Sequence, residues 1–191
     1  DYKWKTGDIH TATTSGPIAP LLEKNFPEIE NAARFFAEGH EFIKTKNETL
    51  EVTPIFSENS FFKFFSYYFV YGDPNTALSQ PNSIVITEHT AQKIFGDVSQ
   101  AYGKVVEYIN RPPQKITGVI KDVPRQSHFN FDVVGVLDAN ADYVKAFQNF
   151  SLYTYVLLKK GTDAGKLQAK MDALITREIK DPGAEIRLPL Q

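Results

Sequence analysis

The stretch SENSFFKFFSYYFVYGDP, residues 57–74, contains eight aromatic residues within the eleven positions from Phe61 to Tyr71. Four of them recur at the spacings of one helix face: Phe61, Phe64, Phe65 and Tyr68. From Tyr67 onward the residues prefer a strand, and residues 72–75 have the composition of a turn. The stretch therefore predicts a short helix that runs directly into a short strand.

Two roles are open for these aromatic residues. In the first, the helix face packs on a neighbouring sheet, where each ring would bury about 150 to 250 Å². In the second, an opposite edge stays exposed for a partner, because aromatic residues are enriched at interfaces and continuous exposed patches rarely lack a use. We expect core packing for the helix face and take Phe62, Tyr67 and Tyr71 as the candidate partner-contact patch.

Before this stretch the pattern predicts a short helix followed by strands. Thr14 or Ser15 can cap a helix whose apolar face includes Ile18, and Pro27 disfavours helical geometry at the residue before it. Residues 29–56 are extended in character with turn-like breaks, which predicts two or three strands.

After the aromatic stretch, a buried strand over residues 82–86 leads into a helix. Thr87 caps this helix, which ends at Gly96. Three further strands have the spacing of a small antiparallel sheet: residues 105–109, 115–121 and 129–137. The chain then forms a strand that is apolar on both faces, expected at the centre of a sheet, and a long helix: residues 152–158 and 164–179.

The order of these elements predicts an α+β fold. The beginning is a helix followed by strands and the end is a strand followed by a helix, so the two ends read as one α+β layer with the β-rich middle inserted. A chain of 191 residues can bury roughly 70% of its unfolded surface, so a hydrophobic core is expected. Its hydrophobic content of 42% and charged content of 23% are typical of globular proteins.

Charge and composition narrow the possible functions. The net charge of -2, with scattered basic residues, argues against a nucleic-acid partner. Cysteine is absent, which excludes disulfides and thiolate chemistry. No apolar run is long enough to span a bilayer, and the start at Asp1 without methionine suggests a fragment of a longer chain.

The residues point to no catalytic, cofactor-binding or metal site. Phosphate loops and dinucleotide sites need clustered glycines that this chain lacks. The histidines are isolated rather than spaced as metal ligands: His10, His40, His89 and His128. Carboxylates flank the predicted elements, where solvated charge is the ordinary role: Glu23, Glu28, Glu30, Asp122 and Asp132.

Several segments, in order, resemble the MacB-like periplasmic core domain of ABC transporter permeases, in the FtsX/MacB/LolC-E superfamily. They are NSFFKFFS (59–66), YGDPNTAL (71–78), PNSIVITE (81–88), AQKIFG (91–96), ITGVIKDVP (116–124) and SHF (127–129). The resemblance is strong over residues 57–132 and weaker in the flanks. One departure is Gln100-Ala101-Tyr102, where the family usually has an acidic residue, proline and an apolar residue before Gly-Lys.

This resemblance implies a periplasmic domain of an inner-membrane permease, inserted between its first two transmembrane helices. It implies a porter-like subdomain over 1–56 and 138–191 and a mostly β, sabre-like insert over 57–137. The implied partners are the transmembrane part of the same permease, a cytoplasmic ABC ATPase acting indirectly, and a periplasmic partner protein or exported substrate. No cofactor is implied.

The expected function is non-catalytic transmission of ATP-driven conformational change to a periplasmic substrate or partner. One alternative is a periplasmic sensor or ligand-binding module, which would need a deep apolar pocket lined by residues 61–71. A more distant alternative is a hydrolase that uses Ser127 and His128. For these two residues, satisfaction of a turn is the simpler interpretation.

Overall fold

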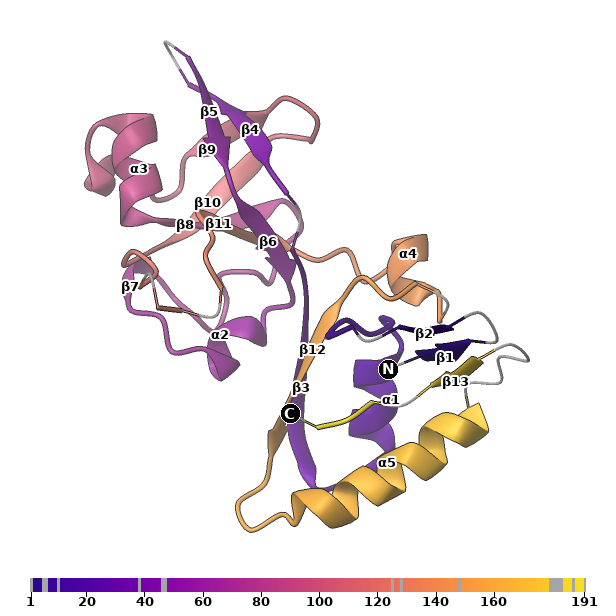
Figure 1. The fold of residues 1–191 in the computed structure, drawn as a ribbon. Coiled ribbons are helices and arrows are strands. Elements are labelled where there is room, and N and C mark those ends of the chain that lie inside the picture. Colours follow the sequence, from indigo (N-terminus) through magenta and orange to yellow (C-terminus); the bar gives the residue numbers. More distant parts are fainter. Residues whose placement is uncertain are drawn as a thin grey trace. The chain divides into compact units, whose positions relative to one another are not determined.

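The computed structural model describes most of the chain and divides it into two compact units. The described ranges are residues 2–4, 7–9, 11–37, 39–45, 48–124, 126–127, 129–147, 149–178, 184–186 and 188–190. Unit 1 contains Asp1–Arg34 and Ala139–Gln191, and unit 2 contains Phe35–Asp138 (Figure 1). The two ends of the chain thus share one unit, and the middle of the chain forms the other.

Unit 1 combines helices and strands. Its strands are β1 (Tyr2–Trp4), β2 (Gly7–Ile9), the first part of β3 (Ile29–Ala37), β12 (Tyr153–Leu158) and β13 (Ala184–Ile186). Its helices are α1 (Ile18–Asn25), α4 (Asp142–Lys145) and α5 (Ala164–Glu178). Strands β13, β1 and β2 form an antiparallel sheet in that order, and β12 lies beside β3.

The hydrophobic core of unit 1 brings α1 and α5 together. Helix α5 buries the apolar stripe that the sequence predicts: Leu167, Met171, Leu174 and Ile175. These side chains pack in one cluster with Ile18 and Leu22 of α1. The helix predicted over residues 164–179 is therefore confirmed as far as Glu178, its last described residue.

Helix α1 begins differently from the prediction. Its N-cap is Pro17, and no side chain caps it. Thr14 instead forms a bridge with Leu152, and its hydroxyl lies 2.6 Å from the Thr154 hydroxyl. Ser15 is fully buried, and its hydroxyl has no partner among the described residues. The predicted cap by Thr14 or Ser15 is wrong because this segment is extended against the chain near β12.

The strand predicted over residues 152–158 is confirmed as β12, but its expected central position is wrong. In the order of the described strands, β12 lies at one end, beside β3. Val156 and Leu158 pack against the core of unit 1, whereas Leu157 is exposed. Alternation of apolar side chains on both faces indicates a strand, but it does not reveal how many neighbours the strand has.

Unit 2 is built on a mixed sheet. Its strands are the end of β3, β4 (Glu41–Lys44), β5 (Thr49–Val52), β6 (Pro54–Ser57), β7 (Phe69–Gly72), β8 (Ser83–Thr87), β9 (Val105–Tyr108), β10 (Gln114–Ile120) and β11 (Val133–Val136). Their order is β3-β6-β11-β8-β10-β9-β4-β5, and β7 also pairs with β10. Its helices are α2 (Phe61–Phe64), α3 (Glu88–Phe95) and the 3₁₀ turn η1 (Val98–Gln100).

The antiparallel sheet predicted for residues 105–109, 115–121 and 129–137 is confirmed for β9 and β10, which pair antiparallel, but β8 lies between β10 and β11 and the whole sheet is mixed. Strand β10 is parallel to β8, and β11 is parallel to β6. Parallel neighbours need a long crossover connection, and the segment from β8 to β10 supplies one through α3 and β9. The α+β class itself is confirmed.

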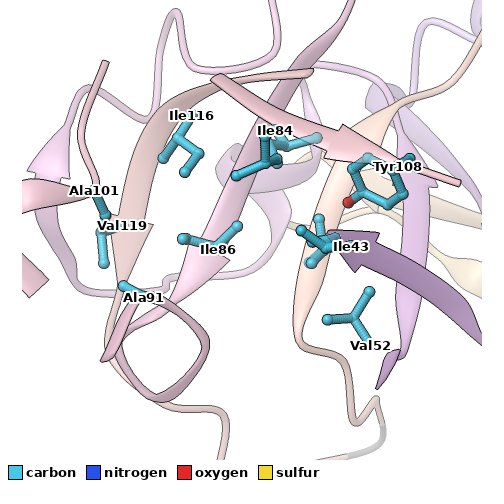
Figure 2. Packing of buried hydrophobic residues seen from close by; sticks show 11 residues of the cluster. Ile43, Val52, Ile84, Ile86, Ala91, Ala101, Tyr108, Ile116 and Val119 are labelled. Carbon is cyan, nitrogen blue, oxygen red and sulfur yellow. The ribbon is translucent and has the colours of Figure 1, made fainter. Parts of the chain in front are cut away.

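The core of unit 2 lies where β8 and β10 meet α3 and β4. All five residues of β8 are buried. Figure 2 shows side chains from these elements gathered in one cluster, among them Ile86, Ile116, Ala91 and Ile43. Strand β8 is fully buried because it lies between two strands, β10 parallel and β11 antiparallel to it, and packs against α3.

The units differ from the predicted subdomains at their first boundary. Residues 35–56 belong to unit 2 rather than to the same body as the chain ends. The reason is pairing: β4 pairs with β9, and β6 pairs with β11, both from the middle of the chain. The assignment of a porter-like and a sabre-like subdomain stays a prediction.

Candidate functional site

Two of the motifs that carry the family resemblance, residues 81–88 and 116–124, meet at the beginning of α3. Thr87 Oγ1 accepts a hydrogen bond from the Thr90 N–H at 3.2 Å, and Asp122 Oδ1 accepts one from the His89 N–H at 2.8 Å. Lys121 Nζ lies 2.9 Å from Glu88 Oε2. Hydrogen bonding to the Glu88 carboxylate raises the pKa of Lys121 above its ordinary value. These polar side chains therefore cap α3 and join it to the end of β10.

The helix predicted from Thr87 to Gly96 is confirmed by this geometry. Helix α3 begins at Glu88, directly after its Thr87 cap, and Gly96 closes it in the left-handed conformation with φ 74°. Both end signals are local and could be read from the sequence. The contribution of Asp122 could not be read, because it lies 33 residues from His89.

Replacing Thr87 with valine is expected to lower the free energy of unfolding by about 1 to 2 kcal/mol, the usual cost of losing a buried helix cap. Valine keeps the shape of the side chain but has no oxygen to accept the Thr90 N–H. Thr87→Ser, which keeps the hydroxyl, should lose less. Urea unfolding of both variants measures the difference, and equal stability of Thr87→Val and the parent chain would contradict the capping role.

The aromatic residues of the opening stretch belong to a network of ring contacts in unit 2, here called the aromatic cluster. It consists of Phe35, Phe61, Phe62, Phe64, Phe65, Tyr67, Phe69, Phe129 and Phe131. Phe61 lies at the centre of this cluster and is fully buried. Its ring stacks with that of Tyr67 at a centroid distance of 5.8 Å. Most other contacts are edge-to-face, the arrangement that aromatic pairs prefer.

The exposure of the residues in and beside this cluster differs from that expected for the predicted contact patch. Phe62 is only 7% exposed, and its ring packs edge-on against Phe69 at 4.9 Å, so its predicted exposure is wrong. Tyr67 is half-buried, and burial raises its pKa. Tyr71 is 37% exposed. Tyr68, expected in the core, is 70% exposed.

The short length of α2 explains these differences. The helix ends at Phe64, and Phe65 already has extended backbone angles. A helical stripe that continued would have placed Tyr68 beside Phe61 and Phe65. In the extended segment, Tyr67 instead faces the cluster and Tyr68 faces solvent.

Unit 2 also contains an open cleft with a volume of about 510 Å³. It is lined by Thr53, Thr87, His89, Asp122, Val123, Asn130, Phe131 and Asp132. Its carboxylates are engaged in the fold, since Asp132 Oδ2 accepts the Thr53 N–H at 2.8 Å and Asp122 accepts the His89 N–H. Among the lining residues, only Phe131 comes from the aromatic cluster. The cleft therefore does not supply the apolar aromatic pocket that a ligand-binding module would need.

Three of the remaining chemical candidates, Ser127, Glu23 and Glu28, also have structural partners. Ser127 Oγ accepts a hydrogen bond from the Phe129 N–H at 3.4 Å. The Ser127 side chain also forms a hydrogen bond with that of Tyr67. His128 lies outside the described residues. Glu23 accepts the Ala32 N–H at 2.6 Å. Glu28 pairs with Lys170 at 2.5 Å, which lowers the pKa of Glu28.

The described ranges contain neither a metal-ligand group nor a membrane-spanning helix. There, histidine and carboxylate side chains form no group of three that could hold a metal ion. No helix in those ranges combines the length and the apolar character that crossing a bilayer requires.

Solved structures share this fold. A domain described as part of a permease from Porphyromonas gingivalis has a TM-score of 0.79 at 23% identity, covering 88% of this chain and 79% of that one. The periplasmic region of MacB from Actinobacillus actinomycetemcomitans has a TM-score of 0.64 at 13% identity, covering 91% and 77%. The extracellular domain of the noncanonic ABC-type transporter YknZ, from Gram-positive bacteria, has a TM-score of 0.64 at 14% identity, covering 88% and 85%.

Fold and motifs together define an extracytoplasmic domain of an ABC transporter permease. The family model of the MacB-like periplasmic core domain matches residues 3–174, most of the chain. The chain therefore belongs to the MacB-like periplasmic core domain family, and the resemblance read from its motifs is confirmed. It is a periplasmic domain of a membrane-bound permease. Among curated protein sequences, none matches the chain.

Proposed function

We propose that this domain transmits conformational change, driven by ATP hydrolysis in a cytoplasmic ATPase, to a periplasmic partner protein or exported substrate. It does so without catalysing a reaction of its own. The family supplies the setting, because a permease has a membrane part and an ATPase partner. The proposed transmission of conformational change rests on the contacts that the polar and aromatic side chains make with one another inside the domain.

The observation that carries the proposal is the internal engagement of the motif residues. The polar side chains of Thr87, Glu88, Lys121 and Asp122 cap a helix and tie it to a strand. The rings of the aromatic cluster pack on one another. A domain packed in this way resists continuous deformation and moves between discrete arrangements. A movement imposed at one of its surfaces is therefore transmitted to another.

The contact patch in this proposal is formed by the exposed tyrosines of the aromatic stretch. Tyr71, from the predicted patch, is joined by Tyr68, and Tyr67 offers its half-buried edge. Phe62 is excluded because it is buried. Tyrosine suits a reversible contact because its ring is apolar and its hydroxyl remains hydrated.

Photo-crosslinking in the full permease with its ATPase, kept in its native membrane, tests this role. A photoreactive phenylalanine analogue at position 68 or 71 should form adducts with a periplasmic protein or substrate, and their yield should differ between ATP and a trapped hydrolysis state. Tyr102, 52% exposed elsewhere in unit 2, is the matched control position. Absence of adducts from positions 68 and 71, or yields independent of nucleotide, would contradict the proposal.

A further inference from the structure

The hairpin formed by β4 and β5 has limited pairing with the rest of unit 2. Strand β4 pairs with β9 at two positions, Ile43 with Tyr108 and Lys44 with Glu107. Strand β9 in turn pairs with β10 through Val106 and Val105. This β4–β5 hairpin lies at the end of the strand order in unit 2. Its ladder to the main sheet therefore consists of a few pairs, and two further links hold it: Thr53 joins β5 directly to β6, and the side chains of Ile43 and Val52 are buried in the core of unit 2.

A stack of side chains makes a second connection at the base of this hairpin. Arg111, in the loop after β9, donates from Nε to Glu41 Oε1 at the start of β4. The Arg111 guanidinium carbon also lies 4.2 Å from the centre of the Phe56 ring on β6. The Phe56 ring covers Gly135 on β11 so closely that a Cβ there would lie 2.7 Å from a ring carbon. The stack thus leads from β4 through Arg111 to two strands of the main sheet.

The Glu41 carboxylate depends strongly on this arginine. Its side chain is 13% exposed, and its second oxygen, Oε2, is buried without a partner among the described residues. Burial, and secondly the negative charge of Glu41, raise the pKa of Tyr108. Removing Arg111 would leave this largely buried carboxylate without the guanidinium that faces it, which is a costly arrangement.

A planar guanidinium is needed for both contacts. It can donate to Glu41 in its plane while its face lies on the Phe56 ring. A lysine ammonium could keep the charge but could not combine the two contacts in the same way. The identity of residue 111, and not only its charge, therefore matters.

We propose that Arg111 is a clamp that fixes the β4–β5 hairpin to the main sheet of unit 2. With the Glu41–Arg111–Phe56 stack intact, hairpin and sheet move as one body. With the stack broken, the buried Ile43 and Val52 still hold the hairpin, but its strands open more often than the main sheet does. This coupling is a property of the folded domain and does not depend on the proposed transport role.

Hydrogen–deuterium exchange of the 191-residue domain tests the clamp. Arg111→Ala should speed exchange of the β4 and β5 backbone amides by about tenfold or more, the factor that corresponds to about 1.4 kcal/mol. Amides of β8 should keep their protection. Arg111→Lys should give an intermediate increase in the hairpin. Lys121→Ala, which removes a cation paired with Glu88 elsewhere in unit 2, should leave the hairpin unchanged.

The Glu41→Gln variant provides a second test of the coupling between Glu41 and Arg111. It removes the charge that requires Arg111, so adding Arg111→Ala to it should speed exchange less than Arg111→Ala does in the parent chain. Unchanged hairpin exchange in Arg111→Ala would overturn the clamp. Equal acceleration in β8 would also overturn it, because the effect would then be global. Full protection in Arg111→Lys would overturn the requirement for a guanidinium.

Discussion

Replacing Phe61 with alanine is expected to lower the free energy of unfolding by about 3 to 5 kcal/mol, the range for truncating a buried phenylalanine. Phe61 is 0% exposed. Its ring lies 4.9 Å from that of Phe65 and 5.3 Å from that of Phe62. It also contacts rings from other segments, including Phe35 at 6.3 Å and Phe131 at 6.2 Å. The cavity left by alanine would border rings that brace one another, so the site could collapse only in part.

Urea unfolding followed by circular dichroism measures this loss. Tyr68→Ala is the matched control, because Tyr68 is an aromatic residue seven positions later that is 70% exposed. Its loss should stay within about 0.5 kcal/mol, as for ordinary surface substitutions. Similar losses for the two variants would contradict the assignment of one ring to the core and the other to solvent.

The contrast between Phe61 and Tyr68 shows what periodicity can and cannot predict. The spacing of the aromatic residues correctly predicted a helix that begins near Phe61 and a strand that ends near Gly72. It could not show that the helix stops after one turn. Once the backbone becomes extended at Phe65, the side-chain period changes from 3.6 to 2, and every later residue is reassigned to a different face.

Elements with signals in adjoining residues were predicted well. Helix α3 has a threonine cap, an acidic first residue and a glycine at its end, all within residues 87–96. Helix α5 has a long apolar stripe. Each of these signals acts within one element, so no knowledge of the remaining fold is needed to read it.

Features that depend on distant residues could not be predicted. Arg111 pairs with Glu41 across 70 positions, and Asp132 binds the Thr53 N–H across 79. The parallel pairing of β11 with β6 likewise joins segments far apart in the chain. A carboxylate that looks solvated in the sequence becomes a structural acceptor only when the fold brings a backbone N–H to it. This is why the acidic residues were expected on the surface.

Gly72→Ala is expected to lower the free energy of unfolding by about 3 kcal/mol or more, because backbone strain and overpacking each cost about 1 to 3 kcal/mol. Gly72 has φ 93°, a conformation that L residues rarely adopt. A Cβ at this position would also lie 2.4 Å from the Thr117 carbonyl oxygen. Gly72 pairs with Gly118 where β7 approaches β10, so the close contact involves backbone that cannot simply rotate away.

Two other glycines separate the causes of this loss. Gly96 has φ 74° but open space around its Cβ position, so Gly96→Ala should show the strain alone, about 1 to 2 kcal/mol. Gly39 has open space and no positive φ, so Gly39→Ala should be neutral or stabilising by up to about 1 kcal/mol. Urea unfolding should therefore rank Gly72→Ala below Gly96→Ala and Gly96→Ala below Gly39→Ala in stability. If Gly72→Ala and Gly96→Ala lose the same amount, β7 can move away from β10 at little cost. The glycine in the YGDP motif would then serve its turn conformation and not the close packing of the two strands.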